Sequence, residues 1–226
     1  MSTSDLIEML STFIKHPIIH PTFLLTTFAI LSAILVAASF KVTYEQIKIN
    51  ERTTLLRSLD DIIPRNRYDN DLFQDYTEMK DTTLFRDEPV MIYRARQGKK
   101  PIAAIFNPVT PEGYNGSIRL LVGIYYEGVL GGVRIISHQE TPGLGDSIEL
   151  RKSKWILGFT GRSLDNPPEA AWKVKRDGGF FDQFTGATIT PRAVVNIIKN
   201  TLIFYQRHKE EIFKCTQEKE GKCMPT

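Results

Sequence analysis

The apolar positions near the N-terminus form one long, unbroken run. Phe23–Phe40 (FLLTTFAILSAILVAASF) consists of apolar and small or hydroxyl residues, with no charged side chain. As a helix this run is about 27 Å long, close to the thickness of a bilayer core. Its late start, its length, and Asp5 and Glu8 in the leader argue against a cleaved signal peptide. The pattern predicts a single retained transmembrane helix over residues 22–40, preceded by an N-terminal segment, residues 1–21.

The hydrophobic pattern after this run changes to helical spacing. The apolar residues between Tyr44 and Pro64 predict an amphipathic stalk helix that the proline ends, at Ile47, Leu55, Leu56, Leu59, Ile62 and Ile63. A polar stretch follows at Arg65–Phe73. Residues 41–88 are therefore interpreted as a stalk helix and linker.

Short apolar runs separated by Pro, Gly and Asn begin near Val90. Four of them predict strands, namely VMIYRAR, IAAIF, SIRLLVGIYY and LGGVRIISH. Tyr126–Gly128 (YEG) reads as the turn of a hairpin between the last two.

Helical patterns and one further strand are predicted after these runs. We expect a helix near Ser147–Leu157, a short strand at Trp172–Arg176, and a final helix from Thr190 or Pro191 to about Phe213. The predicted class is α+β, a small antiparallel sheet packed by helices over residues 89–213, with a charged tail at residues 214–226.

Charge and cysteine content narrow the function classes. The 226 residues include 29 basic and 26 acidic side chains, a net charge of +3, without a long basic run. This argues against nucleic acid as the main partner. Cys215 and Cys223 are not spaced as a CxxC pair and have no histidine cluster nearby, so no metal site is predicted. A disulfide loop and two unpaired thiols both remain open.

The stretch Asp182–Thr190 (DQFTGATIT) precedes the last predicted helix. The Thr190 hydroxyl is expected to cap this helix, and Pro191 suits its first position. Thr188 then lies where backbone N–H groups and the helix dipole favour a phosphate, and Arg192 could add positive charge. From these residues alone, a phosphate site and an ordinary cap without a ligand are both open.

This stretch resembles the flavinylation motif, Asp-x-x-Ser/Thr-Gly-Ala-Thr/Ser, of FMN-binding domains in bacterial membrane redox complexes. In that family a flavin transferase joins the FMN phosphate to the last threonine of the motif through a phosphoester. The resemblance assigns covalent FMN to Thr188. Asp182, Thr185, Gly186 and Ala187 fill the other motif positions, where they serve recognition by the transferase and shape the turn.

The likeness extends over most of the chain. GYNGSIRLLVGI, HQETPGLGDSIE and VKRDGGFFDQFTGATITPRAVVNII also look like that domain. Together with the anchor they resemble the G-subunit family of Rnf electron-transport complexes. The C-subunit family of the sodium-translocating NADH:quinone reductase is a related alternative. The sequence KRDGG before DQFTGATITP favours the G-subunit family.

The resemblance also implies ring contacts. The loop Glu140–Gly145 (ETPGLG) would lie against the isoalloxazine ring, with FMN contacts assigned to Glu140, Thr141, Leu144 and Gly145. Lys175 would lean toward the flavin phosphate or pyrimidine ring, as could its neighbour Arg176. The alternative for the loop is an ordinary helix-entry turn. The alternative for Lys175 and Arg176 is a solvated strand edge.

Other conspicuous side chains are interpreted as structural. His138 and Glu140 alternate at a strand end, but two groups make neither a metal site nor a catalytic triad. Trp155 and Trp172 are expected in the core, and Tyr114 is expected to pack rather than to contact a ring.

The resemblance implies an electron-transfer subunit that is not a complete enzyme alone, in an ion-translocating ferredoxin:NAD oxidoreductase. Its expected partners are the other subunits of the complex, membrane lipid and a flavin transferase. Lysines on both sides of the span leave the orientation undecided. The resemblance supplies it, with residues 1–21 cytoplasmic and the domain periplasmic at a bacterial inner membrane. Non-covalent FMN binding for sensing, and a purely structural membrane subunit, remain the alternatives.

Overall fold

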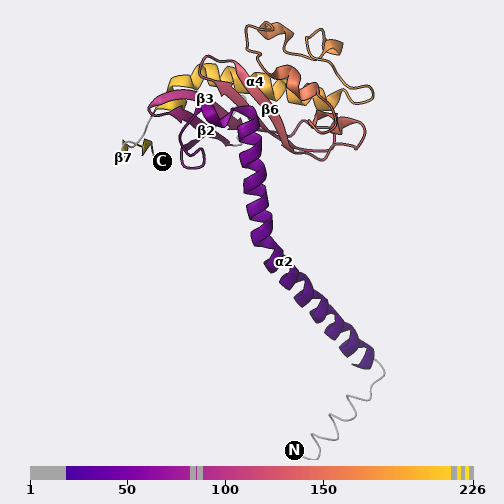
Figure 1. Cartoon of the computed structure of the whole chain (residues 1–226). Helices are drawn as coiled ribbons and strands as arrows, with labels where there is room; N and C mark the ends of the chain where they lie inside the picture. The colour runs from indigo at the N-terminus through magenta and orange to yellow at the C-terminus, as the bar shows by residue number, and fades with distance from the viewer. Residues whose placement is uncertain (1–18, 82–84, 86–88, 215–217, 220–221, 224–226) are drawn as a thin grey trace, which may run out of the picture. The chain divides into compact units, whose positions relative to one another are not determined.

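The computed structural model describes residues 19–81, 85, 89–214, 218–219 and 222–223 (Figure 1). The chain divides into two compact units between Thr54 and Leu55, and each is described by itself. Whether Cys215 and Cys223 form a disulfide or remain unpaired thiols lies outside the described residues, because the structure gives no account of Cys215 or of the Cys223 side chain.

The N-terminal unit is built on helix α2 (Ile19–Ile62), which is 44 residues long. Among the described residues, one helix segment is long and apolar enough to cross a membrane, Pro21–Tyr44, with a mean hydropathy of 2.3. Thr26 and Thr27 within it donate hydrogen bonds of 2.8 Å to carbonyls four residues back, so their hydroxyls need no outside partner. The predicted stalk helix is not a separate element, because α2 continues through it without a break.

The second unit contains a six-stranded antiparallel sheet with strand order β1-β2-β3-β5-β4, and β6 pairs with β5. The strands are β1 (Tyr76–Met79), β2 (Val90–Gln97), β3 (Lys100–Asn107), β4 (Val109–Thr110), β5 (Ile118–Tyr125) and β6 (Leu130–Ser137). The four predicted strands are confirmed as β2, β3, β5 and β6, and the hairpin turn joins the last two. Strand β1 lies in the predicted linker, where no apolar pattern indicates it.

Smaller elements complete the described chain. They are the 3-10 helices η1 (Arg65–Arg67), η2 (Gly145–Ile148), η3 (Trp155–Phe159), η4 (Glu169–Ala171) and η5 (Lys175–Asp177), and the strand pair β7 (Glu218–Lys219) and β8 (Lys222–Cys223). Together with the sheet and the long helices they confirm the α+β class.

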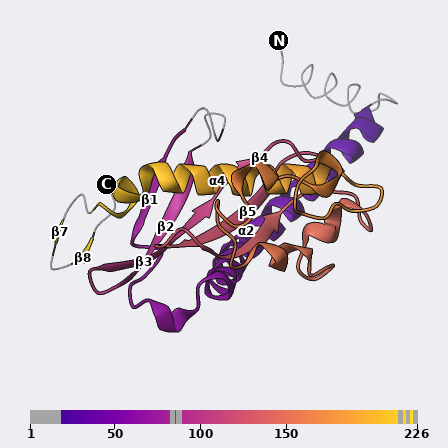
Figure 2. The same cartoon turned by 90° about the horizontal axis from the view of Figure 1, so that it is seen from above.

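Both faces of the sheet are buried. Helix α4 (Ile189–Phe213) lies across one face (Figure 1, Figure 2), where Val194 and Phe204 join a core with Phe106 of β3. The other face is covered by the end of α2 and the segment after it, including Leu59, Ile62, Ile63, Tyr68 and Leu72. Two buried faces explain why the strands read as continuous apolar runs rather than as alternating ones.

The close approach of α2 to this second face depends on a glycine. A Cβ at Gly123 of β5 would lie 2.1 Å from Cγ2 of Ile62. Any side chain at this position would therefore displace the end of α2 from the sheet. Ile62 and its neighbour Ile63 are almost completely buried there.

Two sequence predictions in this unit are wrong. The helix expected near Ser147–Leu157 is replaced by η2 and η3. The Ser153 hydroxyl donates to the Ser147 carbonyl (2.7 Å) and accepts from the Trp155 backbone N–H (3.1 Å), and these local bonds compete with a helix. The strand expected at Trp172–Arg176 is reduced to a single bridge from Val174 and is followed by η5.

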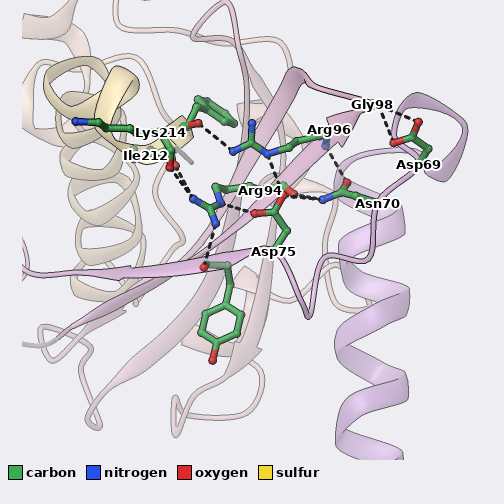
Figure 3. Close-up of polar contacts among 10 residues, drawn as sticks. Asp69, Asn70, Asp75, Arg94, Arg96, Gly98, Ile212 and Lys214 are labelled. Atoms are coloured by element: carbon green, nitrogen blue, oxygen red, sulfur yellow. Dashed lines mark hydrogen bonds and ion pairs between the residues drawn. The ribbon is translucent and has the colours of Figure 1, made fainter. Parts of the chain in front are cut away.

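Buried charges fasten the far end of α4 to the sheet (Figure 3). The Asp75 carboxylate lies between two arginines of β2 and accepts from Arg94 Nε at 2.6 Å and from Arg96 Nε at 2.9 Å. All three side chains are more than nine-tenths buried. Arg94 Nη1 and Arg96 Nη2 donate to backbone carbonyls where α4 ends, at Ile212, Phe213 and Lys214, and Arg94 Nη2 donates to the Tyr76 carbonyl of β1. One carboxylate and the carbonyl end of a helix thus compensate two buried cations.

We expect Asp75→Asn to lower the free energy of unfolding by about 3–5 kcal/mol, because it leaves two buried guanidinium groups without their anion. Urea unfolding of the full chain in detergent would measure this. Asp69→Asn is the matched control. Its exposed carboxylate accepts from the Gly98 N–H at 2.9 Å, and its loss should cost about 0.5 kcal/mol or less. Equal effects of the two substitutions would contradict the role given to the Asp75 charge.

Candidate cofactor site

The site lies where α4 begins. Thr188 is the N-cap residue, and Thr190, in the first turn, is almost completely buried. The Thr190 hydroxyl donates to Oε2 of Glu140. The prediction that Thr190 caps the helix is therefore wrong. A bond to an ionised acceptor is stronger than one between neutral groups, and the carboxylate takes the hydroxyl away from the helix end.

Glu140 joins three segments of the chain behind the site. Its carboxylate is buried, receives the Thr190 hydroxyl of α4, and accepts from the Asn115 backbone N–H at 3.3 Å. The loop after Glu140 passes so close that a Cβ at Gly145 would lie 2.6 Å from Oε2. This explains physically why a glycine occupies the last position of ETPGLG.

His138 supports the same loop from the outside. Its Nδ1 accepts from the Glu140 backbone N–H at 3.0 Å, so its Nε2 donates to Glu149 Oε1 at 2.8 Å. Burial raises the pKa of the Glu149 carboxyl, but hydrogen bonds from His138 and Arg151 outweigh burial and leave this pKa lowered. These contacts agree with the structural interpretation of His138.

A cavity of about 320 Å³ opens in front of these groups. It is lined by seven of the ten residues predicted for the site, namely Glu140, Thr141, Leu144, Gly145, Gly186, Ala187 and Thr188. The glycine loop and the threonine motif, which are separated in sequence, thus form the walls of one cavity. The side chain of Leu144 is 43% exposed and supplies an apolar surface.

The other three predicted residues do not line this cavity. Lys175 Nζ and Asp182 Oδ1 form an exposed ion pair of 2.6 Å, and the Asp182 carbonyl accepts from the Trp155 indole N–H at 2.8 Å. Thr185 is exposed on the turn. In this structure Lys175 therefore pairs with a residue of the motif and not with a group in the cavity.

Among the other lining residues, Arg176 was expected beside Lys175 as a contact to the flavin, Ile189 was not predicted, and Tyr114 was misassigned. Arg176 Nη1 donates to Thr188 Oγ1 at 3.2 Å, and Ile189 lines the cavity with a 45% exposed side chain. Tyr114 also lines the cavity and is 66% exposed, so the expectation that it packs against the protein is wrong. Tyr114 belongs to the GYNG turn at the rim of the cavity. The residues around it do not have the apolar spacing that is typical of a core position.

Arg192 does not direct its charge to Thr188. Its guanidinium forms two bonds with the Asp177 carboxylate, at 2.6 and 2.9 Å. The hydrogen bond from Arg192 lowers the pKa of Asp177, and the same bond raises the pKa of Arg192. The expectation for Arg192 is corrected because Asp177, directly before the αL glycine Gly178, accepts from both arms of its fork.

The cavity combines apolar side chains with a hydroxyl and a guanidinium. A flat, largely apolar ring needs such a surface with a few polar groups to orient it, and an attached phosphate needs a cation. Residues 113–203 match the FMN-binding domain family, so the fold and site define an FMN-binding domain.

Individual relatives identify a narrower family than the FMN-binding domain does. The chain is 46% identical to the G subunit of an ion-translocating oxidoreductase complex from Pseudoalteromonas atlantica, over 86% of this chain and 91% of the relative. It is 45% and 43% identical to the proteins of the same name from Shewanella baltica and Vibrio cholerae, over 88% of this chain and 94% and 95% of theirs. The chain belongs to this G-subunit family.

We expect Thr190→Val to lower the free energy of unfolding by about 1–3 kcal/mol, because it leaves the buried Glu140 carboxylate without its hydroxyl donor. Chemical denaturation would measure it. Thr201→Val is the matched control on the same helix, since that buried hydroxyl donates only locally, to the Ile197 carbonyl at 2.7 Å. A smaller loss at position 190 than at position 201 would refute the importance of the Glu140 contact.

Proposed function

We propose that the chain is the FMN-carrying electron-transfer subunit of an ion-translocating oxidoreductase complex, and that FMN is held covalently by a phosphoester to Thr188. The observation that carries the proposal is the position of the Thr188 hydroxyl. It lies in the wall of the cavity and accepts a hydrogen bond from Arg176 instead of capping α4. Membership of the G-subunit family supports the role in the complex.

The proposed attachment is a substitution at phosphorus. The Thr188 Oγ–H bond breaks and its proton passes to a base of a flavin transferase. A bond forms from Oγ to the flavin phosphorus, and the bond from that phosphorus to the leaving group of an activated flavin nucleotide breaks. Thr188 serves as an attachment point, and the chemistry of the transfer belongs to the transferase.

The residues around the cavity suit a held redox group. FMN, when bound, supplies electron transfer, and the protein supplies position and surroundings. Leu144 and Ile189 offer apolar surface, Thr141 offers a hydroxyl that already accepts from Asn115 at 3.0 Å, and Glu140 fixes both walls from behind. Lys175, Asp182 and Thr185 are exposed and so remain available to a transferase.

The setting of this subunit is also part of the proposal. By family resemblance, the complex exchanges electrons between ferredoxin and NAD and couples this to ion movement. The apolar part of α2 would anchor the chain in the bacterial inner membrane, in contact with lipid and with the other subunits. The domain would lie on the periplasmic side.

The covalent bond is tested by the mass of the intact protein. We expect full-length protein made with a flavin transferase to gain the mass of FMN minus water and to give a fluorescent band on a denaturing gel. Thr188→Val should lose both signals, and Thr188→Ser should keep them, because it retains the hydroxyl. A flavin that is released on denaturation would favour non-covalent binding, and colourless wild-type protein would favour a structural subunit.

Orientation is tested by an impermeant thiol reagent applied to reduced cells with a permeable outer envelope. We expect Cys215 and Cys223 to be labelled without lysis if the domain is periplasmic. A variant with serine at both positions is the control. Labelling that appears only after the inner membrane is broken would place the domain in the cytoplasm.

A further inference from the structure

We propose that Arg176 is the residue that binds the flavin phosphate, and that it neutralises the charge left on Thr188 after attachment. This inference rests on the proposed function. It assigns to Arg176 the role that was expected first of Lys175. The assignment follows from how the cations around the threonine motif are paired.

The Arg176 side chain points at the attachment residue. Its Nη1 donates to Thr188 Oγ1 at 3.2 Å, and the residue lines the cavity. The acceptor is a neutral hydroxyl, which leaves the positive charge of the guanidinium uncompensated by that bond. Among the described residues, no carboxylate forms an ion pair with Arg176.

The neighbouring cations are paired. Lys175 forms its ion pair with Asp182 at 2.6 Å, and Arg192 forms two bonds with Asp177. Of Lys175, Arg176 and Arg192, two therefore hold protein carboxylates and one faces Thr188. Arg176, which faces Thr188, is therefore the cation that can contact the proposed phosphate.

Arg176 is positioned by contacts on both sides. Its backbone N–H donates to Gln183 Oε1 at 3.2 Å, which ties it to the threonine motif. The Asp177–Arg192 pair fastens the next residue to the first turn of α4. A residue held in this way by its neighbours keeps its geometry when a ligand arrives. Gln183 thus gains a role at a motif position that the flavinylation pattern leaves variable.

The chemistry of the two partners matches. A phosphodiester between Thr188 and riboflavin has two oxygens that are not part of the ester bonds, and they share one negative charge. A guanidinium presents parallel N–H groups that fit two such oxygens, which an ammonium does not. The hydroxyl contact seen now would become a contact to the phosphate attached at the same oxygen.

The first experiment uses full-length protein made without a transferase, purified in detergent, and free FMN as the probe. Flavin fluorescence quenching would give the affinity at several salt concentrations. Arg176→Gln should weaken binding by about ten- to a hundredfold and remove most of the salt dependence. Lys175→Gln, the matched control at the adjacent position, should stay within about twofold.

The second experiment measures loading with the transferase present. Arg176→Gln should accept flavin more slowly than wild type, and the phosphorus NMR signal of its loaded fraction should shift, since the diester has lost its cation. If Arg176→Gln does not fold, Arg176→Lys decides the matter. It keeps the charge but not the fork, and its affinity for FMN should fall severalfold.

The outcomes separate this inference from the function on which it rests. If wild-type protein never gains the flavin mass, the covalent proposal fails. If wild type is loaded but the Arg176 variants bind FMN, load and give the phosphorus signal as wild type does, the inference about Arg176 is overturned. A larger effect of Lys175→Gln than of Arg176→Gln would return the phosphate to Lys175.

Discussion

The buried carboxylate of Glu140 holds together the segments that make the site. Removing a carboxylate from water is costly unless hydrogen bonds replace its hydration. Here the Thr190 hydroxyl and the Asn115 backbone N–H do so. These two donors come from the start of α4 and from the 113–116 turn, while Glu140 itself begins the glycine loop. The position of Thr188 relative to the facing wall of the cavity therefore depends on one charged group that solvent hardly reaches.

The fold was predictable wherever local pattern and packing agree. The four main strands and α4 appear, since burial on one or two sides of an element leaves a mark in the sequence. The long apolar run appears as the exposed apolar part of α2. The failures occur where side chains compete with regular hydrogen bonding. Ser153 interrupts the helix expected around it, and the segment near Val174 forms one bridge because it turns at once into η5. Strand β1 carries few apolar residues and is defined by its pairing with β2.

The candidate site was indicated by a motif and not by a hydrophobic or charge pattern. The resemblance pointed to both walls of the cavity, and the structure brings the glycine loop and the threonine motif together. The sequence could not show which of several nearby cations faces Thr188, because pairing among Lys175, Arg176 and Arg192 depends on tertiary distances of a few ångströms. The exposure of Tyr114 and the hydrogen bond from Thr190 to Glu140 could not be predicted from the sequence for the same reason.

The arginine pair beside Asp75 connects early and late parts of the chain. Two of the carbonyls that the Arg94 side chain contacts come from residues 118 and 120 positions later. During synthesis these acceptors are made more than a hundred residues after the arginines, so the two guanidinium groups cannot be enclosed with their full set of partners until the end of α4 has been made. A chain ending before Ile212 would carry the cost of these cations without the helix terminus that offsets it.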